Sequence, residues 1–189
     1  MPHKFSPQNI ERLMRRDRLG GITAEGLLKG AGLKKGMTFA DIGCGPGFFV
    51  IPASGVVGKK GTVYAVDMQD EMLAELKKRI SGRTNIIPVK SGEHTMPVGG
   101  KMVDFALMAY VLHETESKPL FLKEVRRVLK DGGKVLLLDW EKKVEDHGPP
   151  FEERIRREDA VTLLKGAGFE ITRESSLDPS HYRLEAMKV

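Results

Sequence analysis

The chain has 189 residues, of which 40% are hydrophobic and 30% are charged, a balance typical of one soluble globular domain with a proper core. Its formal net charge is +5, but the basic residues are spread along amphipathic segments rather than gathered with aromatic ones, so nucleic acid is not an expected partner. Cys44 is the only cysteine, which excludes an intramolecular disulfide and a thiolate metal cluster, and no apolar run reaches the roughly 18 residues of a membrane span.

Residues 1–22 are predicted to form an N-terminal arm with a short charged helix over 8–19. This charge excludes a secretory signal peptide, so the expected location is cytoplasmic, with no membrane partner. A second helix is predicted over 24–31, with Thr23 as its N-cap. Both helices precede the first strand, so they form either a surface pair or a lid over a site. Three side chains are candidates for contacts from such a lid: Phe5, Arg15 and Arg18.

Residues 23–189 alternate between two patterns and form the predicted globular domain. Short apolar runs rich in β-branched residues predict strands over 38–42, 62–66, 85–89, 103–108, 134–138, 169–173 and 182–189. Segments with one apolar face predict helices over 48–57, 71–80, 119–129 and 157–165. This alternation predicts an α/β fold, in which a mostly parallel sheet has helices on both faces. The last two strands are joined by a polar turn and are expected to be antiparallel.

Three local features complete the prediction. Asp70 and Ser117 precede helical segments and are expected to act as side-chain N-caps. The sequence Asp131-Gly132-Gly133 is expected to turn the chain before the fifth strand. The polar segment 141–154, which contains two consecutive prolines, is expected to be a loop over the strand ends.

The stretch 40–47, with the sequence ADIGCGPG, follows the first predicted strand and leads into a helix. Glycines allow a sharp turn and close approach to a ligand, and a helix start directs backbone N–H groups at it. A dinucleotide fingerprint, G-x-G-x-x-G, would need a glycine at Phe48. The glycines here follow Asp41 with the spacing G-x-G-x-G: Gly43, Gly45 and Gly47.

This stretch resembles motif I of the class I S-adenosylmethionine-dependent methyltransferases, an acidic residue followed by G-x-G-x-G. The resemblance extends over about residues 23–189. It implies a Rossmann-like sheet of seven strands, with the last strand inserted antiparallel, and S-adenosylmethionine as cofactor, with no metal. The motifs after the fourth and fifth strands look most like the ubiquinone/menaquinone-biosynthesis branch, whose acceptors are small organic molecules.

Asp67 stands at the carboxyl end of the second predicted strand. The resemblance implies that its carboxylate accepts hydrogen bonds from both ribose hydroxyls of the cofactor; the alternative is a helix-capping or turn aspartate. Met68 lies either on the adenine face or in the core. The aspartate that the family usually has after strand three is replaced by Gly92, which leaves the adenine contact to backbone groups or to Glu93.

The end of the fourth strand is expected to meet the methionine part of the cofactor through the backbone at Met108 and Ala109, while Asp41 reaches its ammonium group. Cys44 lies inside the glycine turn, where a small residue fits. The expected cofactor-binding residues are therefore Asp41, Gly43, Cys44, Gly45, Gly47, Asp67, Met68, Ser91, Gly92, Glu93, Met108 and Ala109.

His113 is the candidate catalytic residue, because an imidazole titrates near neutral pH and can take a proton from a methyl acceptor. The alternative is a histidine that packs against or caps the following helix. Three aromatic residues either shape an acceptor pocket or belong to the core: Phe49, Tyr110 and Trp140.

The predicted function is methyl transfer from S-adenosylmethionine to a small-molecule acceptor by in-line displacement. One alternative is a non-catalytic S-adenosylmethionine-binding module or subunit. The other is an NAD-dependent oxidoreductase, which the glycine spacing disfavours. The acceptor, the methylated atom (C, O, N or S) and the oligomeric state are left open by the sequence.

Overall fold

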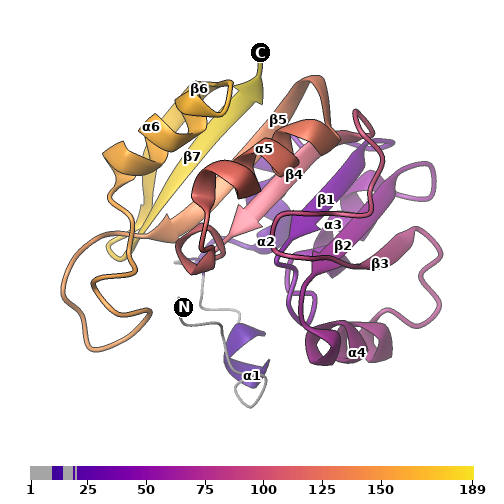
Figure 1. Cartoon of the computed structure of the whole chain (residues 1–189). Helices are drawn as coiled ribbons and strands as arrows, with labels where there is room; N and C mark the ends of the chain where they lie inside the picture. Colours follow the sequence, from indigo (N-terminus) through magenta and orange to yellow (C-terminus); the bar gives the residue numbers. More distant parts are fainter. Residues whose placement is uncertain (1–9, 15–18, 20) are drawn as a thin grey trace.

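The computed structural model describes residues 10–14, 19 and 21–189 of the chain (Figure 1). Its centre is a seven-stranded sheet in the order β3-β2-β1-β4-β5-β7-β6. The strands are β1 (Thr38–Ile42), β2 (Thr62–Asp67), β3 (Ile86–Lys90), β4 (Val103–Ala109), β5 (Leu129–Trp140), β6 (Phe169–Asp178) and β7 (His181–Lys188). Neighbours from β3 to β5 are parallel, and β7 is antiparallel to both β5 and β6. This confirms the predicted α/β fold and the inserted antiparallel last strand.

The helices cover both faces of the sheet, as predicted (Figure 1). They are α1 (Ile10–Leu13), α2 (Ala24–Gly30), α3 (Val50–Val57), α4 (Asp70–Arg79), the 3-10 turn η3 (Leu112–Glu114), α5 (Lys118–Val128) and α6 (Arg157–Gly166). Buried side chains of α2, α3 and α4 form one hydrophobic cluster with the sheet, and those of α5 and α6 form another on the opposite face.

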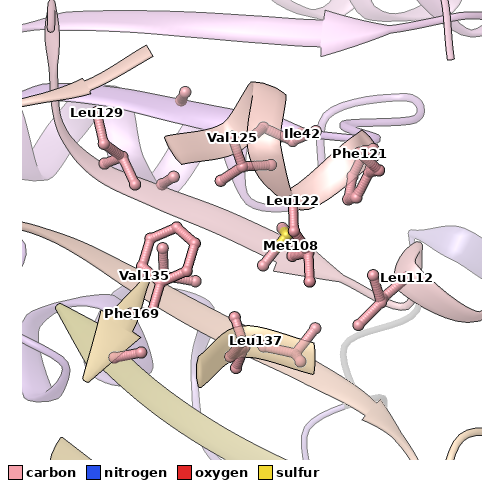
Figure 2. Close-up of a cluster of buried hydrophobic side chains, with 14 of the residues drawn as sticks. Ile42, Met108, Leu112, Phe121, Leu122, Val125, Leu129, Val135, Leu137 and Phe169 are labelled. Atoms are coloured by element: carbon pink, nitrogen blue, oxygen red, sulfur yellow. The ribbon is translucent and has the colours of Figure 1, made fainter. Parts of the chain in front are cut away.

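The two-residue period of the strands creates these two clusters. In β4, Phe105 and Leu107 belong to the cluster of α2–α4, whereas Ala106 and Met108 belong to that of α5 and α6. Figure 2 shows the second cluster, with Leu122 of α5 close to Met108 of β4. The central strands are therefore buried on both sides, which explains their continuous apolar sequences.

The site is positioned by the change of direction at β1. The chain moves from β1 outward through β2 and β3, and then returns to place β4 on the other side of β1. The pairing of Ile42 with Met108 confirms that these strands are neighbours. In open α/β sheets, the crevice at the carboxyl ends of two such strands is where ligands bind.

Helix starts differ from the predictions in three places. α3 begins at Val50 rather than at residue 48, because turns continue through the glycine stretch. The predicted Asp70 cap is wrong: Gln69 holds the N-cap position, and the Asp70 carboxylate lies 2.6 Å from Lys90 Nζ. Ser117 does hold the N-cap position of α5, but its side chain makes no capping hydrogen bond. The Thr23 cap is confirmed, since its hydroxyl accepts the Gly26 N–H at 3.0 Å.

The fifth strand begins earlier than predicted. β5 starts at Leu129 and runs through Asp131-Gly132-Gly133, which were expected to form a turn. Gly132 has φ 71°, and the register with β4 shifts between Val103 and Phe105. The glycines therefore accommodate an irregularity within a paired strand.

The segment 141–156 contains no helix or strand, in agreement with the predicted loop, and is called loop 141–156 below. At the N-terminal end, α1 lies within the predicted helix over 8–19, of which residues 8–9 and 15–18 are outside the described residues. The three lid candidates, Phe5, Arg15 and Arg18, lie outside the described residues. None of the helices in the described part of the chain is long and apolar enough to cross a membrane.

Candidate functional site

A cavity of about 610 Å³ opens at the carboxyl ends of β1, β2, β4 and β5. Its lining comes from the glycine turn after β1, the end of β2, residues 91–93, the ends of β4 and β5, loop 141–156 and the start of β7. This volume lies within the range of about 300–1,000 Å³ that is common for small-molecule and cofactor sites. Residues far apart in the sequence thus meet in one place.

The glycine turn needs its glycines for both conformation and space. Gly43 and Gly47 have φ 74° and 99°, in a region that side chains rarely adopt. A Cβ on Gly43 would lie 2.7 Å from Val111 Cγ2, and one on Gly47 would lie 2.5 Å from Leu76 Cδ1. These two glycines therefore allow the turn to pack against its own protein.

Gly45, in contrast, borders the cavity. Its φ is 51°, and the nearest atom to an added Cβ would be Leu13 Cδ1 of α1, at 3.6 Å. Leu13 and Gly45 both line the cavity, so α1 lies beside the mouth of the glycine turn. This position is what a covering helix would require.

Asp67 connects the end of β2 to the glycine turn. Its Oδ2 accepts the Gly45 N–H and its Oδ1 accepts the Gln69 N–H, both at 2.8 Å. The carboxyl group is buried, and burial raises its pKa against the opposing effect of these hydrogen bonds. Each carboxylate oxygen has a second lone pair, so Asp67 can serve the turn and still accept hydrogen bonds from a ligand in the cavity that it lines.

Cys44 is buried beside two carboxylates. Burial raises the pKa of its thiol, and the charges of Asp41 and Asp67 raise it further. The thiol therefore stays protonated near neutral pH, which argues against nucleophilic chemistry at this cysteine.

The segment after β3 is folded tightly by its own backbone. Ser91 N–H donates to Asp67 O at 3.0 Å, and Gly92 N–H donates to Thr95 O at 2.9 Å. A Cβ on Gly92 would lie 2.7 Å from Thr95 Oγ1, so the aspartate that the resemblance implies at this position would require Thr95 to move. Glu93 Oε1 accepts the Glu116 N–H at 2.5 Å.

The cavity brings together most of the residues proposed from the sequence. The lining includes Asp41, Gly43, Cys44, Gly45, Phe49, Asp67, Met68, Ser91, Gly92, Glu93, Ala109, Tyr110, His113 and Trp140. Two candidates lie elsewhere: Met108 is fully buried in the core of Figure 2, and Gly47 faces Leu76. Among the residues that the structure describes, no three His, Cys, Asp or Glu side chains are grouped so that they could hold a metal ion.

His113 is held by a buried carboxylate that the sequence interpretation missed. Its Nδ1 lies 2.6 Å from Asp139 Oδ1, and its backbone N–H donates to Asp139 Oδ2 at 3.3 Å. Since the carboxylate accepts at Nδ1, the neutral ring has its free lone pair on Nε2. Burial lowers the pKa of His113, but the charge and hydrogen bond of Asp139 outweigh it and leave the pKa raised.

Four ring-bearing side chains form what we call the aromatic wall of the cavity: Tyr110, Trp140, His147 and His181. The Trp140 and His181 rings lie 4.2 Å apart between centroids, and Tyr110 lies 5.0 Å from His181. His181 Nδ1 also lies 2.8 Å from Asp178 Oδ2, so the cavity has a second histidine–carboxylate pair. Tyr110 has φ 60°, an unusual value for a residue with a side chain.

The sequence interpretation missed three residues of this region: Asp139, His147 and His181. Asp139 is the last residue but one of β5, as Asp67 is the last residue of β2, and the rule that directed attention to the end of β2 would have found it. His147 and His181 lie in a loop and after a tight turn, where no local sequence pattern indicates that they approach the end of β4.

Residues 40–137 match the family model described as a methyltransferase domain. A demethylmenaquinone methyltransferase from Staphylococcus aureus (strain MRSA252) is 30% identical over 140 residues, which are 70% of this chain and 57% of that protein. The chain therefore spans little more than half the length of the curated relatives that it matches.

Solved structures show the same likeness. A SAM dependent methyltransferase from Aquifex aeolicus has a TM-score of 0.92 and 36% identity, covering 98% of this chain and 100% of that one. The cyclase SpnF, at 16% identity and a TM-score of 0.73, shares the fold over 87% of this chain and 80% of its own. The chain therefore belongs to the methyltransferase domain family, among the S-adenosylmethionine-dependent methyltransferases, and its cofactor is S-adenosylmethionine.

Proposed function

We propose that this chain transfers a methyl group from S-adenosylmethionine to a small organic acceptor. The observation that carries the proposal is the composition of the cavity: one part is formed by the glycine turn, Asp67 and residues 91–93, and the other by the aromatic wall and the His113–Asp139 pair. A nucleoside site and a polar, ring-lined site next to each other are what a two-substrate transfer requires.

The residues present fit the cofactor. Gly45 leaves the mouth of the turn open, and Asp67 offers carboxylate lone pairs at the strand end, where ribose hydroxyls would be bound. Asp41 and Ala109 line the cavity at the ends of β1 and β4, in position for the methionine part. Met68 and residues 91–93 border the region that would receive the adenine. Met108 contributes through its backbone, since its side chain is in the core.

The bound cofactor supplies an activated methyl group on a good leaving group. The protein therefore has to align the acceptor for in-line displacement and to exclude water, and proximity and orientation supply most of the rate. His113 is suited to receive the proton that an acceptor hydroxyl or amine loses. Asp139 holds its Nδ1–H, so the lone pair that accepts the proton is on Nε2, 3.9 Å from Glu114 Oε1, and both carboxylates stabilise the ring once it is charged.

The lining also restricts the acceptor. None of the described lining residues is Lys or Arg, whereas Asp41, Asp67, Glu93 and Glu114 are all present. Among the described lining residues, an anionic acceptor would meet four carboxylates and neither Lys nor Arg, so a neutral acceptor is favoured. The name of the S. aureus relative, a demethylmenaquinone methyltransferase, suggests a quinone-type ring compound as one such acceptor.

The test is an acceptor screen with radiolabelled S-adenosylmethionine and a panel of naphthalenediols, phenols, amines and thiols. We expect labelled product from at least one neutral ring compound, and binding of S-adenosylhomocysteine by calorimetry. Absence of binding would refute the cofactor site. Binding without product from any acceptor would support the alternative, a cofactor-binding module without methyl transfer.

A further inference from the structure

Loop 141–156 is organised around a buried arginine. The side chain of Arg154 is only 1% exposed. It donates to three carbonyl groups of its own loop: Nε to Pro149 O at 3.0 Å, Nη1 to Glu141 O at 3.2 Å and Nη2 to His147 O at 2.5 Å. A segment without helix or strand lacks the regular backbone hydrogen bonds that satisfy carbonyl groups. In this loop, the Arg154 guanidinium donates hydrogen bonds to three of them instead.

Arg154 also connects the loop to the turn between β6 and β7. Its Nη1 lies 2.5 Å from Glu145 Oε2, and Glu145 Oε1 accepts the Ser180 hydroxyl at 2.6 Å. Burial would raise the pKa of Glu145, but the hydrogen bonds from Ser180, Arg154 and Lys143 hold it at about 2. The ion pair therefore persists at neutral pH, and Ser180 directly precedes His181 of the aromatic wall.

The third contact of Arg154 is with Trp140. The guanidinium carbon lies 5.0 Å from the centre of the Trp140 rings, within the range of a cation–π contact. Gly148, with φ 86°, fits between them: an added Cβ would lie 2.7 Å from Trp140 Cζ3 and 2.9 Å from Arg154 Nη2. Ring, glycine and guanidinium are thus packed together without space for another methyl group.

All the segments that Arg154 joins contribute to the same side of the cavity. Trp140, His147, Gly148 and Pro149 line it, and so does His181, which the Glu145–Ser180 hydrogen bond reaches. None of the contacts of Arg154 found within the described residues involves the glycine turn, Asp67 or residues 91–93. The arginine is thus specific to one half of the cavity.

We propose that Arg154, through its ion pair with Glu145, is a positioning residue that holds the aromatic wall in the geometry that receives the methyl acceptor. The inference rests on the proposed function for the identity of what the wall receives, but the positioning itself is a property of the fold. A buried ion pair is a weak source of stability compared with apolar packing, whereas it fixes directions well. Arg154 orders the wall and leaves the cofactor half unchanged.

The test uses the full chain and its single tryptophan, Trp140, as reporter. Arg154→Lys and Glu145→Gln are compared with Arg156→Met, whose exposed side chain pairs with Asp159 and contacts no part of the wall. For each variant, Trp140 emission, its quenching by acrylamide, S-adenosylhomocysteine affinity and the kinetics with 1,4-naphthalenediol are measured. Among the described residues, Glu145 makes no contact with the Trp140 rings. A change of Trp140 emission in Glu145→Gln therefore cannot come from removal of a side chain that covers these rings.

We expect Arg154→Lys and Glu145→Gln to shift Trp140 emission to longer wavelength and to increase its quenching by acrylamide. Both variants should raise the KM for the acceptor more than they lower kcat. Their affinity for S-adenosylhomocysteine should change by no more than about twofold, as expected of sites that share no contacts. Unchanged Trp140 emission and quenching in Glu145→Gln would overturn the proposal, and so would a loss of cofactor affinity equal to the effect on the wall. If the wild type fails to bind S-adenosylhomocysteine or to methylate, the proposed function fails, while the Trp140 measurements still decide whether the pair positions the wall.

Discussion

The buried side chain of Asp139 orients both the candidate base and the first residue of the aromatic wall on β5. It accepts hydrogen bonds from His113 Nδ1, from the His113 backbone and from the Trp140 backbone at 2.6, 3.3 and 2.9 Å. It thereby fixes the tautomer of the candidate base, its orientation and the start of the aromatic wall. The same contacts would serve a structural histidine and a catalytic one, so both interpretations of His113 stay predictions.

Substitution Asp139→Asn should separate them. Burial alone lowers the pKa of His113, and Asp139 reverses this, so the variant should have a lower His113 pKa by NMR titration. The rate should then rise with pH at a lower midpoint, because the neutral ring is the form that accepts a proton. The wild-type pair stabilises the fold at pH below the ordinary histidine pKa, and this contribution is lost as pH rises through the raised value.

The control for this experiment is Asp178→Asn, which removes the carboxylate from a second paired histidine of the cavity, His181. It should leave the midpoint of the pH–rate curve unchanged. A shift in this control and none in Asp139→Asn would assign the base to His181.

In His113→Ala, turnover should fall about 10²–10⁴-fold with cofactor binding intact, the usual contribution of one positioned base.

Asp67 allows a second test at the residue scale. Asp67→Asn keeps the size of the side chain but removes its charge, so S-adenosylhomocysteine should bind about 1.5–3 kcal/mol more weakly in calorimetry, the value of a hydrogen bond to a charged group. Asp70→Asn is the matched control, since that exposed carboxylate pairs with Lys90 at the surface. Equal affinity in wild type and Asp67→Asn would mean that Asp67 serves only the turn that it closes with Gly45.

At the scale of elements, the sequence predicted what local pattern determines. The bounds of β1 agree with the prediction at both ends, because an apolar run between Thr38 and the glycines has clear limits. β5 began earlier than expected, because the strand continues through Asp131-Gly132-Gly133, which has the composition of a turn and lies where the register with β4 shifts. The glycine spacing located one half of the cavity. Two other features depend on contacts between separate segments, which no local pattern encodes: the pairing of His113 with Asp139 and the pairing of Arg154 with Glu145.

The glycine turn gives a prediction at this scale. Gly47→Ala combines a positive φ with a Cβ that would lie 2.5 Å from Leu76 Cδ1, so it should destabilise the protein by about 2–4 kcal/mol in urea denaturation. Gly55→Ala, in the middle of α3 and with no atom within 4 Å of the added Cβ, should stabilise by about 0.5–1 kcal/mol. Similar denaturation midpoints for the two variants would contradict the packing role of Gly47.

At the scale of the whole molecule, the sheet order places the two halves of the cavity on different parts of the chain. The glycine turn, Asp67 and residues 91–93 follow β1, β2 and β3, whereas the aromatic wall comes from β4, β5, loop 141–156 and β7. A family model that ends at residue 137 therefore covers the first half and not most of the second. Membership of the family supports the proposed cofactor half, whereas the proposed acceptor half rests on the residues of this chain alone.

This division predicts how ligands stabilise the protein. S-adenosylhomocysteine at about 100 times its Kd should add about 2.7 kcal/mol of stability, which is roughly 5–11 °C in Tm for a domain of this size. NAD should give no shift in Tm, because Phe48 takes the place of the third glycine of a dinucleotide site.

The Tm shift with S-adenosylhomocysteine should persist in Arg154→Lys and shrink in Asp67→Asn, since only Asp67 belongs to the cofactor half. Thermal scans of the three proteins with each ligand check this, with the unliganded Tm of each variant as its own reference. A shift with NAD as large as that with S-adenosylhomocysteine would reject the assignment of the glycine turn, whereas an equal loss of the shift in both variants would show that the two halves of the cavity are not independent.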